Sequence, residues 1–303
     1  MRFCQKTVGE DYPYYFSSYF AHNYRYRRMS QLLDAPGEKT VDDHWQFQRD
    51  TKNLMAVELA PIMAAALAAH EDTKEMGRIL AEWSFMDDAD SAAPTIFQTV
   101  YRKFAEKVFT DELGPKLTAT MLGSWYFWQH RLEGMTKAGD SPWFDDVNTP
   151  NKVETRDELF HDAALSAAEE LGEEIGGPPG DWLWGKVHRI EFVNPLRRHG
   201  AGKSLVGGRV YPMSGSGETL YRAKYAFDRP GWVTFSASLR MVVDLGDPDK
   251  VLAVLPGGVT GRTLHPHFND QLAPFMSGEK VYWWFSDEAV AEHAVHTLVL
   301  QPS

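Results

Sequence analysis

The sequence has 303 residues, of which 43% are hydrophobic and 24% charged, and its formal net charge is −11. This composition is that of a globular protein with a large core, which argues against global disorder. The acidic balance argues against a nucleic-acid-binding protein, because phosphate contacts need a basic face. Cys4 is the only cysteine, so no disulfide can form within the chain. No apolar run approaches the roughly 18 residues of a membrane-spanning helix.

The first 175 residues are predicted to be mostly helical. Thr40 and Asp43 are spaced like a capping box at the start of one helix, and Thr155 and Glu158 form a second such pair. After the second cap, apolar side chains recur at the spacing of one helical face. These residues are Leu159, Ala163, Ala167, Leu171 and Ile175.

Three further positions are expected to interrupt or bound helices. Pro61 is expected to kink or break the helix that follows the first cap. A later helix is expected to begin at a Ser91 cap and to stop at residues 114–115, Gly-Pro.

The second half of the chain is predicted to form strands. Residues 176–180, Gly-Gly-Pro-Pro-Gly, end the helical pattern, and in residues 233–243 apolar and mostly polar side chains then alternate. Helices followed by strands indicate the α+β class, with a mostly helical region over residues 1–175 and a mostly antiparallel β-rich region over residues 181–303. We expect the two regions to form one interlocked structural unit. The other expected strands lie within residues 209–213, 219–227, 250–255, 280–285 and 296–302.

Two glycine-containing segments are similar to catalytic or binding motifs but fail at a required position. Residues 197–204 end like a phosphate-binding loop, yet Arg197 stands where the pattern needs Gly. Residues 214–219, Ser-Gly-Ser-Gly-Glu-Thr, resemble a nucleophile elbow, yet Ser214 stands where Gly is required. A glycine-rich turn between strands accounts better for the second segment.

The segment 256–271, PGGVTGRTLHPHFNDQ, contains histidines that admit two interpretations. His265 and His267 would project to one side of an extended chain, and with Asp270 and His188 they could bind zinc. No third ligand has a firm spacing, however, so we favour an ordered loop that joins two strands, and we expect no metal or other cofactor.

Aromatic neighbours surround two other candidate positions. His188 follows Trp182 and Trp184, which favours a packed aromatic cluster with a hydrogen-bonded histidine. Arg25, Arg27 and Arg28 lie near several tyrosines and form either a basic surface patch or a carboxylate-binding group at the rim of a pocket.

The order of these segments resembles a known family. Over residues 4–302, the series is similar to the later part of the β subunit of the penicillin acylase family, amidohydrolases with an N-terminal nucleophile. The resemblance implies part of an αββα sandwich and the hydrolysis of a small-molecule linear amide, such as the acyl side chain of a β-lactam or an N-acyl homoserine lactone. The segments are residues 7–28, 46–56, 181–196, 214–220, 236–271 and 296–302.

The resemblance also implies roles for a few residues. The family's catalytic serine begins the β subunit, far upstream of the matching segments, so this chain is expected to lack the nucleophile and to be inactive alone. Cys4 and Gln5 occupy the place of an asparagine of the oxyanion hole, and they are the candidates on the oxyanion side. Arg27 falls where the family has an arginine near the substrate. The loop 256–271 is structural in the family.

Three functions remain open at this point. The first is the C-terminal portion of such an amidohydrolase, whose partner is the missing upstream part, the α subunit and the N-terminal β segment. The second is a standalone non-catalytic module that binds an acyl compound or a protein. The third is a metal hydrolase built on the four candidate zinc ligands named above.

The first function carries expectations about surface and location. A fragment should expose strand edges and apolar surface, and it should self-associate or bind the missing part. Trp182, Trp184, Trp283 and Trp284 are expected in that contact. The first 15 residues lack the apolar core of a signal peptide. The location is therefore periplasmic if the complete protein is exported and cytoplasmic otherwise.

Overall fold

The computed structural model describes residues 6–9, 11–17, 20–124, 128–192, 208–227 and 229–302. The chain forms two compact units, each assembled from separate stretches of the sequence. Among the described residues, no helix combines the length and the apolar character that crossing a lipid bilayer requires. Unit 1 comprises Met1–Asp34, Asp50–Glu191 and Val210–Ser236, and unit 2 comprises Ala35–Arg49, Phe192–Arg209 and Ala237–Ser303.

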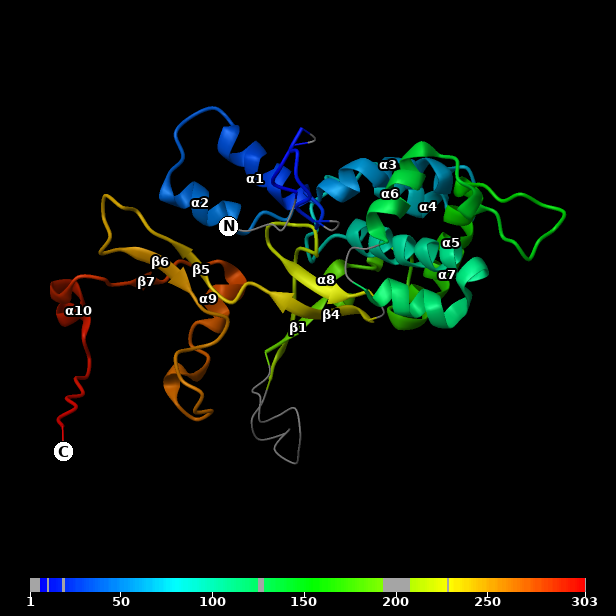
Figure 1. Ribbon diagram of the computed structural model, residues 1–303. Coiled ribbons are helices and arrows are strands. Elements are labelled where there is room, and N and C mark those ends of the chain that lie inside the picture. Colours follow the sequence, from blue (N-terminus) through cyan, green and yellow to red (C-terminus); the bar gives the residue numbers. More distant parts are fainter. Residues whose placement is uncertain are drawn as a thin grey trace. The chain divides into compact units, whose positions relative to one another are not determined.

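Helices make up most of unit 1 (Figure 1). Its largest hydrophobic core lies among α3, α5 and α7, where the rings of Phe104 and Phe160 stack with their centroids 4.0 Å apart. The helices are α1 (Tyr24–Asp34), α3 (Leu54–Ala68), α4 (Lys74–Ala81), α5 (Ala93–Gly123), α6 (Gln129–Ala138), α7 (Arg156–Glu174) and α8 (Trp184–Val187), with the 3-10 turns η1 (Pro142–Phe144) and η2 (Pro179–Asp181).

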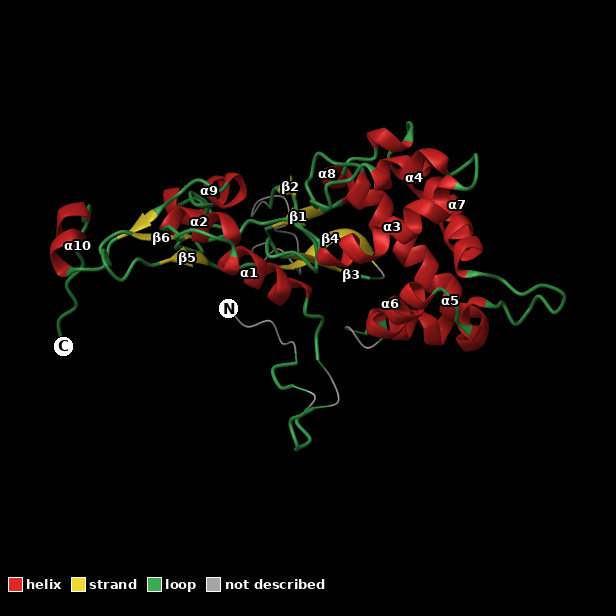
Figure 2. Cartoon of the chain, turned by 90° about the horizontal axis from the view of Figure 1, so that it is seen from above, coloured by secondary structure: helices red, strands yellow, loops and turns green. Residues whose placement is uncertain are grey.

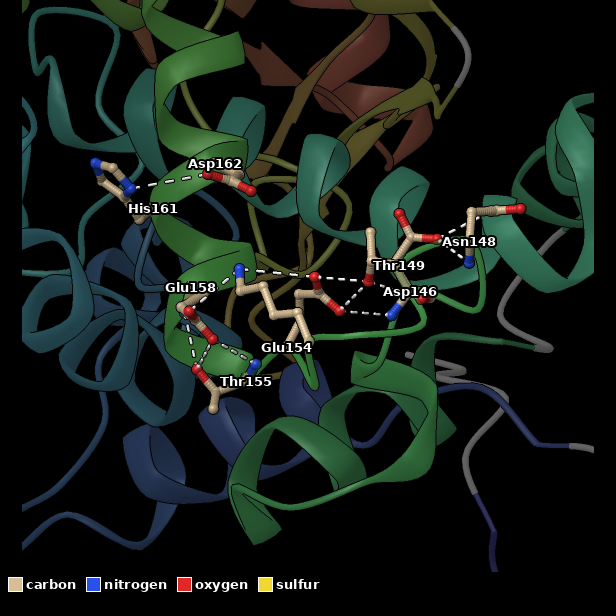
Figure 3. Close-up of polar contacts among 9 residues, drawn as sticks. Asp146, Asn148, Thr149, Glu154, Thr155, Glu158, His161 and Asp162 are labelled. Carbon is tan, nitrogen blue, oxygen red and sulfur yellow. Dashed lines mark hydrogen bonds and ion pairs between the residues drawn. The ribbon is translucent and has the colours of Figure 1, made fainter.

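Both predicted capping boxes are confirmed. Thr40 caps α2 (Val41–Phe47) together with Asp43, and Thr155 caps α7 together with Glu158. Figure 3 shows the second box, in which the Glu158 carboxylate accepts a hydrogen bond from the Thr155 backbone N–H at 2.9 Å. The predicted apolar face of α7 is buried against the core as far as Leu171. Local sequence therefore defines where these helices begin and which way they face.

The helix break considered at Pro61 and the cap expected at Ser91 are wrong. Helix α3 runs on through Pro61. Proline has no backbone N–H, so Pro61 cannot donate to the carbonyl of Val57 as a helical residue normally would. Both residues lie on the exposed side of α3, where water can hydrogen-bond to that carbonyl. The N-cap of α5 is Ala92 rather than Ser91, because the carbonyl of Ser91 accepts a hydrogen bond from the N–H of Trp184 at 2.8 Å. The expected break at Gly114 is present as non-helical backbone, after which Pro115 opens a second helical stretch.

A four-stranded sheet completes unit 1. The strand order is β2-β1-β4-β3, and β1 and β4 are parallel whereas the two outer pairs are antiparallel. The glycine-rich segment 214–219 forms a turn ahead of β3, as expected. The strands are β1 (Arg189–Glu191), β2 (Val210–Pro212), β3 (Ala223–Ala226) and β4 (Arg229–Ser236).

Unit 2 is a small antiparallel sheet with helical cover (Figure 2). The strand order is β5-β6-β7, and Trp45, Leu252, Val254 and Phe275 form its buried cluster. The elements are α2, β5 (Arg240–Val242), β6 (Val251–Val254), the 3-10 turn η5 (Pro266–Phe268), α9 (Leu272–Ser277), β7 (Tyr282–Trp283) and α10 (Asp287–His293).

Two predicted strands differ from the structure. Residues 233–243, predicted as one strand, are divided between β4 and β5, which belong to separate sheets. Residues 296–302 form no strand and are exposed, because no neighbouring strand among the described residues pairs with them. Figures 1 and 2 show this C-terminal segment and α10 extending away from the sheet of unit 2. The predicted α+β class, with helices first and small, mostly antiparallel sheets after them, is confirmed.

Candidate functional site

Arg27, the arginine singled out in the sequence, lies at the edge of a polar cluster in unit 1. Its guanidinium forms an ion pair with Glu58 of α3, with Nη1 and Oε1 2.5 Å apart. Lys137 of α6 pairs with the other oxygen of the same carboxylate. Although partial burial alone would raise the pKa of Glu58, these two cations outweigh it and lower the pKa. Arg27 is therefore held in place while its side chain stays partly exposed to solvent.

Behind this ion pair lies a second, buried group of side chains. The Tyr24 hydroxyl donates to Oε2 of Glu133 at 2.7 Å, and Nδ1 of His22 lies 3.4 Å from the same oxygen. His22, Tyr24 and Glu133 are all buried, whereas His130 is exposed and stacks on the His22 ring with centroids 3.8 Å apart.

The electrostatics of this group follow from the buried carboxylate. Burial alone would lower the pKa of His22, but the hydrogen bond and charge of Glu133 raise it. Burial and the charge of Glu133 both raise the pKa of Tyr24, so its hydroxyl remains a donor. The pKa of His130 is lowered by partial desolvation of its ring, one face of which stacks on His22, and then by the charge of His22. One carboxylate thus organises a tyrosine and two imidazoles.

The backbone explains how these side chains meet. His130, Glu133 and Lys137 follow one another at three- and four-residue spacing in α6, which places them on one side of that helix. Tyr24 is the first residue of α1, and His22 lies two residues before that helix. Sequence reasoning missed His22, His130 and Glu133, although the spacing of His130 and Glu133 within a helix is a recognisable signal.

Two cavities of unit 1 lie next to α6. The smaller, about 370 Å³, is lined by Lys224, whose pKa is lowered to about 7 by burial and then by the charge of Arg222. Tyr225 also lines this cavity, and its hydroxyl donates to Oε1 of Gln98 at 2.6 Å. The larger, about 770 Å³, is mostly apolar. Its lining comprises Phe109, Leu113, Met121, Trp128, His130, Arg131, Gly134, Met135 and Trp143.

His188 lies in the core of unit 1. Its side chain has no solvent exposure, and its ring stacks on Trp184 with centroids 4.2 Å apart. Nδ1 lies 2.6 Å from the carbonyl of Met213, and Nε2 lies 3.0 Å from the carbonyl of Ala223. Burial lowers the pKa of His188 to about 4, although both carbonyl contacts oppose the shift. The ring ties β3 to the residue that follows β2.

The histidines of the loop 256–271 are exposed in unit 2. Nδ1 of His267 lies 2.8 Å from Oδ2 of Asp270, and the N–H of His267 donates to Nδ1 of His265 at 3.1 Å. The backbone N–H of Gln271 donates to the carbonyl of Gly257, which closes the loop. Cys4 and Gln5, the candidates on the oxyanion side, lie outside the described residues.

One group in the described part of the chain has the composition of a metal site. The donor atoms of His22, His130 and Glu133 all lie within 4.8 Å of one another. No residue of the loop 256–271 belongs to a group of this kind among the described residues.

Comparison with known proteins decides the family. The family model described as penicillin amidase matches residues 3–292, nearly the whole chain. The chain belongs to the penicillin amidase family. The resemblance inferred from the order of the segments is therefore confirmed.

Relatives within the penicillin amidase family are longer than this chain. An acyl-homoserine lactone acylase QuiP from Pseudomonas fluorescens strain Pf0-1 is 27% identical over 298 residues, which cover 91% of this chain and 35% of that protein. A QuiP from Pseudomonas syringae pv. tomato is 24% identical over 301 residues, with the same coverage. The penicillin acylase 2 proenzyme of Pseudomonas sp. strain SE83 is 24% identical, with 98% of this chain and 38% of that protein covered. The chain thus spans little more than a third of these relatives.

A solved structure shares the fold of the chain. The thermostable penicillin G acylase from Alcaligenes faecalis superposes with a TM-score of 0.59 and 16% sequence identity, covering 99% of this chain and 57% of that chain. The aligned part of the chain includes residues of both units, and the likeness shows the fold.

Proposed function

We propose that the chain is the C-terminal portion of an amidohydrolase that cleaves a linear amide, with N-acyl homoserine lactones as the first substrate class to test. The observation that carries the proposal is the penicillin amidase match over residues 3–292. The substrate class is supported by the relatives named acyl-homoserine lactone acylase. The acyl side chain of a β-lactam is the second class, supported by the relative named penicillin acylase 2 proenzyme.

We propose that the nucleophile comes from sequence outside these residues and that the chain is inactive alone. In the proposed reaction a hydroxyl oxygen attacks the amide carbonyl, the C–N bond breaks, and the amine leaves with a proton. Water then hydrolyses the acyl-enzyme and releases the acid. The proposal is supported by the share of the relatives that the chain spans, which is 35–38%.

Within this scheme we propose that Arg27 faces the substrate. Its pairing with Glu58 fixes the guanidinium, and its partly exposed side chain leaves donors for acceptor oxygens on the substrate. Cys4 and Gln5 remain the candidates on the oxyanion side, where a donor to the tetrahedral oxyanion is typically worth about 3–4 kcal/mol.

The assay that tests the proposal uses the purified chain and a chromogenic fatty-acyl anilide. We expect no turnover by the chain alone. As a check, the same assay is run on a variant in which all five Ser, Thr and Cys residues among the first thirty are replaced. Turnover that is equal in both proteins would mean that the chain performs amide hydrolysis by another chemistry.

A standalone binding module is the second candidate. Exposed apolar side chains in unit 2, among them Leu245, Leu264 and Phe285, favour a surface that contacts another molecule. The two candidates differ in whether a second polypeptide restores amidase activity.

A further inference from the structure

We propose that His22, His130 and Glu133 form a zinc site in unit 1. Two imidazoles and one carboxylate suit Zn²⁺, whereas Ca²⁺ and Mg²⁺ favour sets made wholly of oxygen. The inference does not rest on the proposed amidohydrolase function, because all three ligands belong to the described part of this chain.

The distances within the group fit a tetrahedral ion. Zinc–nitrogen and zinc–oxygen bonds of about 2.0–2.1 Å place two ligands of a tetrahedral site about 3.3 Å apart. Nδ1 of His22 and Oε2 of Glu133 are 3.4 Å apart, and the donor atoms of all three side chains lie within 4.8 Å of one another. The buried ligands are thus already at coordination spacing.

The helix supplies two of the ligands in a fixed relation. His130 and Glu133 are three residues apart in α6 and therefore share a face of that helix. His130 is exposed, so its ring can turn from the stack on His22 toward the ion. Coordination would tie α6 to the residues just before α1.

The Glu133 carboxylate is held in place but only partly satisfied. Tyr24, which is buried, donates to Oε2, as second-sphere partners of metal ligands commonly do. The other oxygen, Oε1, is buried and has no hydrogen-bond partner among the described residues. Burying an incompletely satisfied carboxylate is costly, and a cation bound to it would offset that cost.

The nearby arginine and lysine side chains are engaged elsewhere, whereas the His22 imidazole contacts Glu133. Arg27 and Lys137 both pair with Glu58, so neither neutralises Glu133 in the structure. Three protein ligands leave a fourth tetrahedral position, and the exposure of His130 places solvent on that side. The ion would therefore carry a water molecule or another small ligand there.

A matched control exists on the surface of the same unit. His70 and His161 also stack with centroids 3.8 Å apart, and His161 contacts Asp72 at 2.9 Å. These residues also supply two imidazoles and a carboxylate, yet they do not form a group of three donors at coordination spacing. Replacing His161 should leave zinc binding unchanged.

The test is calorimetric zinc titration of the full 303-residue chain after treatment with a chelator. We expect one tight zinc per chain in the wild type, affinity at least about 100-fold weaker in His130→Ala and Glu133→Gln, and wild-type affinity in His161→Ala and His267→Ala. Calcium should not compete. His130→Ala changes an exposed side chain, and circular dichroism checks that each variant is folded.

Cobalt provides an independent readout of geometry. Co²⁺ in a tetrahedral site of this composition should give intense visible absorption that is lost in His130→Ala. No zinc binding at micromolar concentration would overturn the proposal. So would binding that persists in both His130→Ala and Glu133→Gln, or binding that is lost in His267→Ala.

Discussion

At the scale of single residues, Arg27 connects the family resemblance to the structure. It pairs with Glu58 and reaches solvent, which is the arrangement of a fixed but accessible donor. In an enzyme completed with its nucleophile, we expect Arg27→Lys to raise KM about tenfold with little change in kcat, because a lysine loses the forked donor geometry. Arg78→Lys, which replaces another exposed, ion-paired arginine, is the control and should leave both constants unchanged. A fall in kcat with KM unchanged would contradict the substrate-binding role.

His188 makes a prediction about pH. Its pKa is lowered by burial to about 4, so the folded protein keeps the ring neutral where the unfolded chain takes up a proton near pH 6.5. The stability contributed by His188 is therefore complete above about pH 6.5 and is lost as pH falls toward 4. Relative to His188→Gln, the free energy of unfolding of the wild type should fall by at most about 1.4 kcal/mol for each unit that the pH is lowered in this window.

Urea unfolding at a series of pH values measures this difference. The buried Asp87, whose pKa is raised to about 7 by burial, contributes the opposite slope, and subtracting the variant from the wild type removes its effect. A stability difference that stays constant between pH 7 and pH 4 would show that His188 is not protonated on unfolding.

At the scale of elements, the sequence predicted what depends on local interactions. The two capping boxes and the buried face of α7 rest on side chains within a turn or two of one another. Residues 296–302 have the alternating pattern of a strand, but no strand among the described residues pairs with them. A sequence pattern does not show whether a neighbouring strand is present to pair with. The division of residues 233–243 between two sheets depends on tertiary neighbours in the same way.

The candidate site was only partly predictable for the same reason. Arg27 was identified through the family resemblance, but its partner Glu58 lies 31 residues away in the sequence. Tyr24 and Glu133 are 109 residues apart. Contacts at such separations leave no periodic signal, so the polar cluster emerges only when α1, α3 and α6 are packed together.

The turn before β3 provides a test at this scale. Gly215 has φ of +83°, and a Cβ atom there would lie 2.0 Å from the carbonyl oxygen of Tyr221. Gly215→Ala should therefore destabilise the protein by about 3–5 kcal/mol. Gly217→Ala is the matched control in the same turn, since the nearest atom, Cγ of Lys224, would be 3.6 Å away. Thermal unfolding compares the two variants, and equal midpoints would contradict this account of the turn.

At the scale of the whole molecule, large apolar side chains are exposed in both units, and several of them lie in the C-terminal segment of unit 2. Leu298 and Leu300 in the C-terminal segment are 83% and 85% exposed. Trp182 and Trp184 were expected in a partner contact, but that expectation is wrong, because both are buried in the core of unit 1. Trp283 and Trp284 in unit 2 keep partial exposure.

This surface predicts association. We expect the purified chain to self-associate at micromolar concentration, or to bind a hydrophobic dye, because exposed apolar side chains favour contact with another apolar surface. Deletion of residues 295–303 should reduce both effects, because it removes the exposed side chains of Val295, Leu298, Val299 and Leu300. Sedimentation velocity measures the association, and a monomer without dye binding would favour the standalone module.

The release of homoserine lactone from an N-acyl homoserine lactone tests the central claim most directly. The chain is assayed alone and after co-expression with a polypeptide that supplies the proposed upstream segment, with the lactone quantified by mass spectrometry. The account predicts no release by the chain alone and clear release by the pair, abolished when the first serine of the upstream β segment is replaced by alanine. Release by the chain alone at the rate of the pair would contradict it.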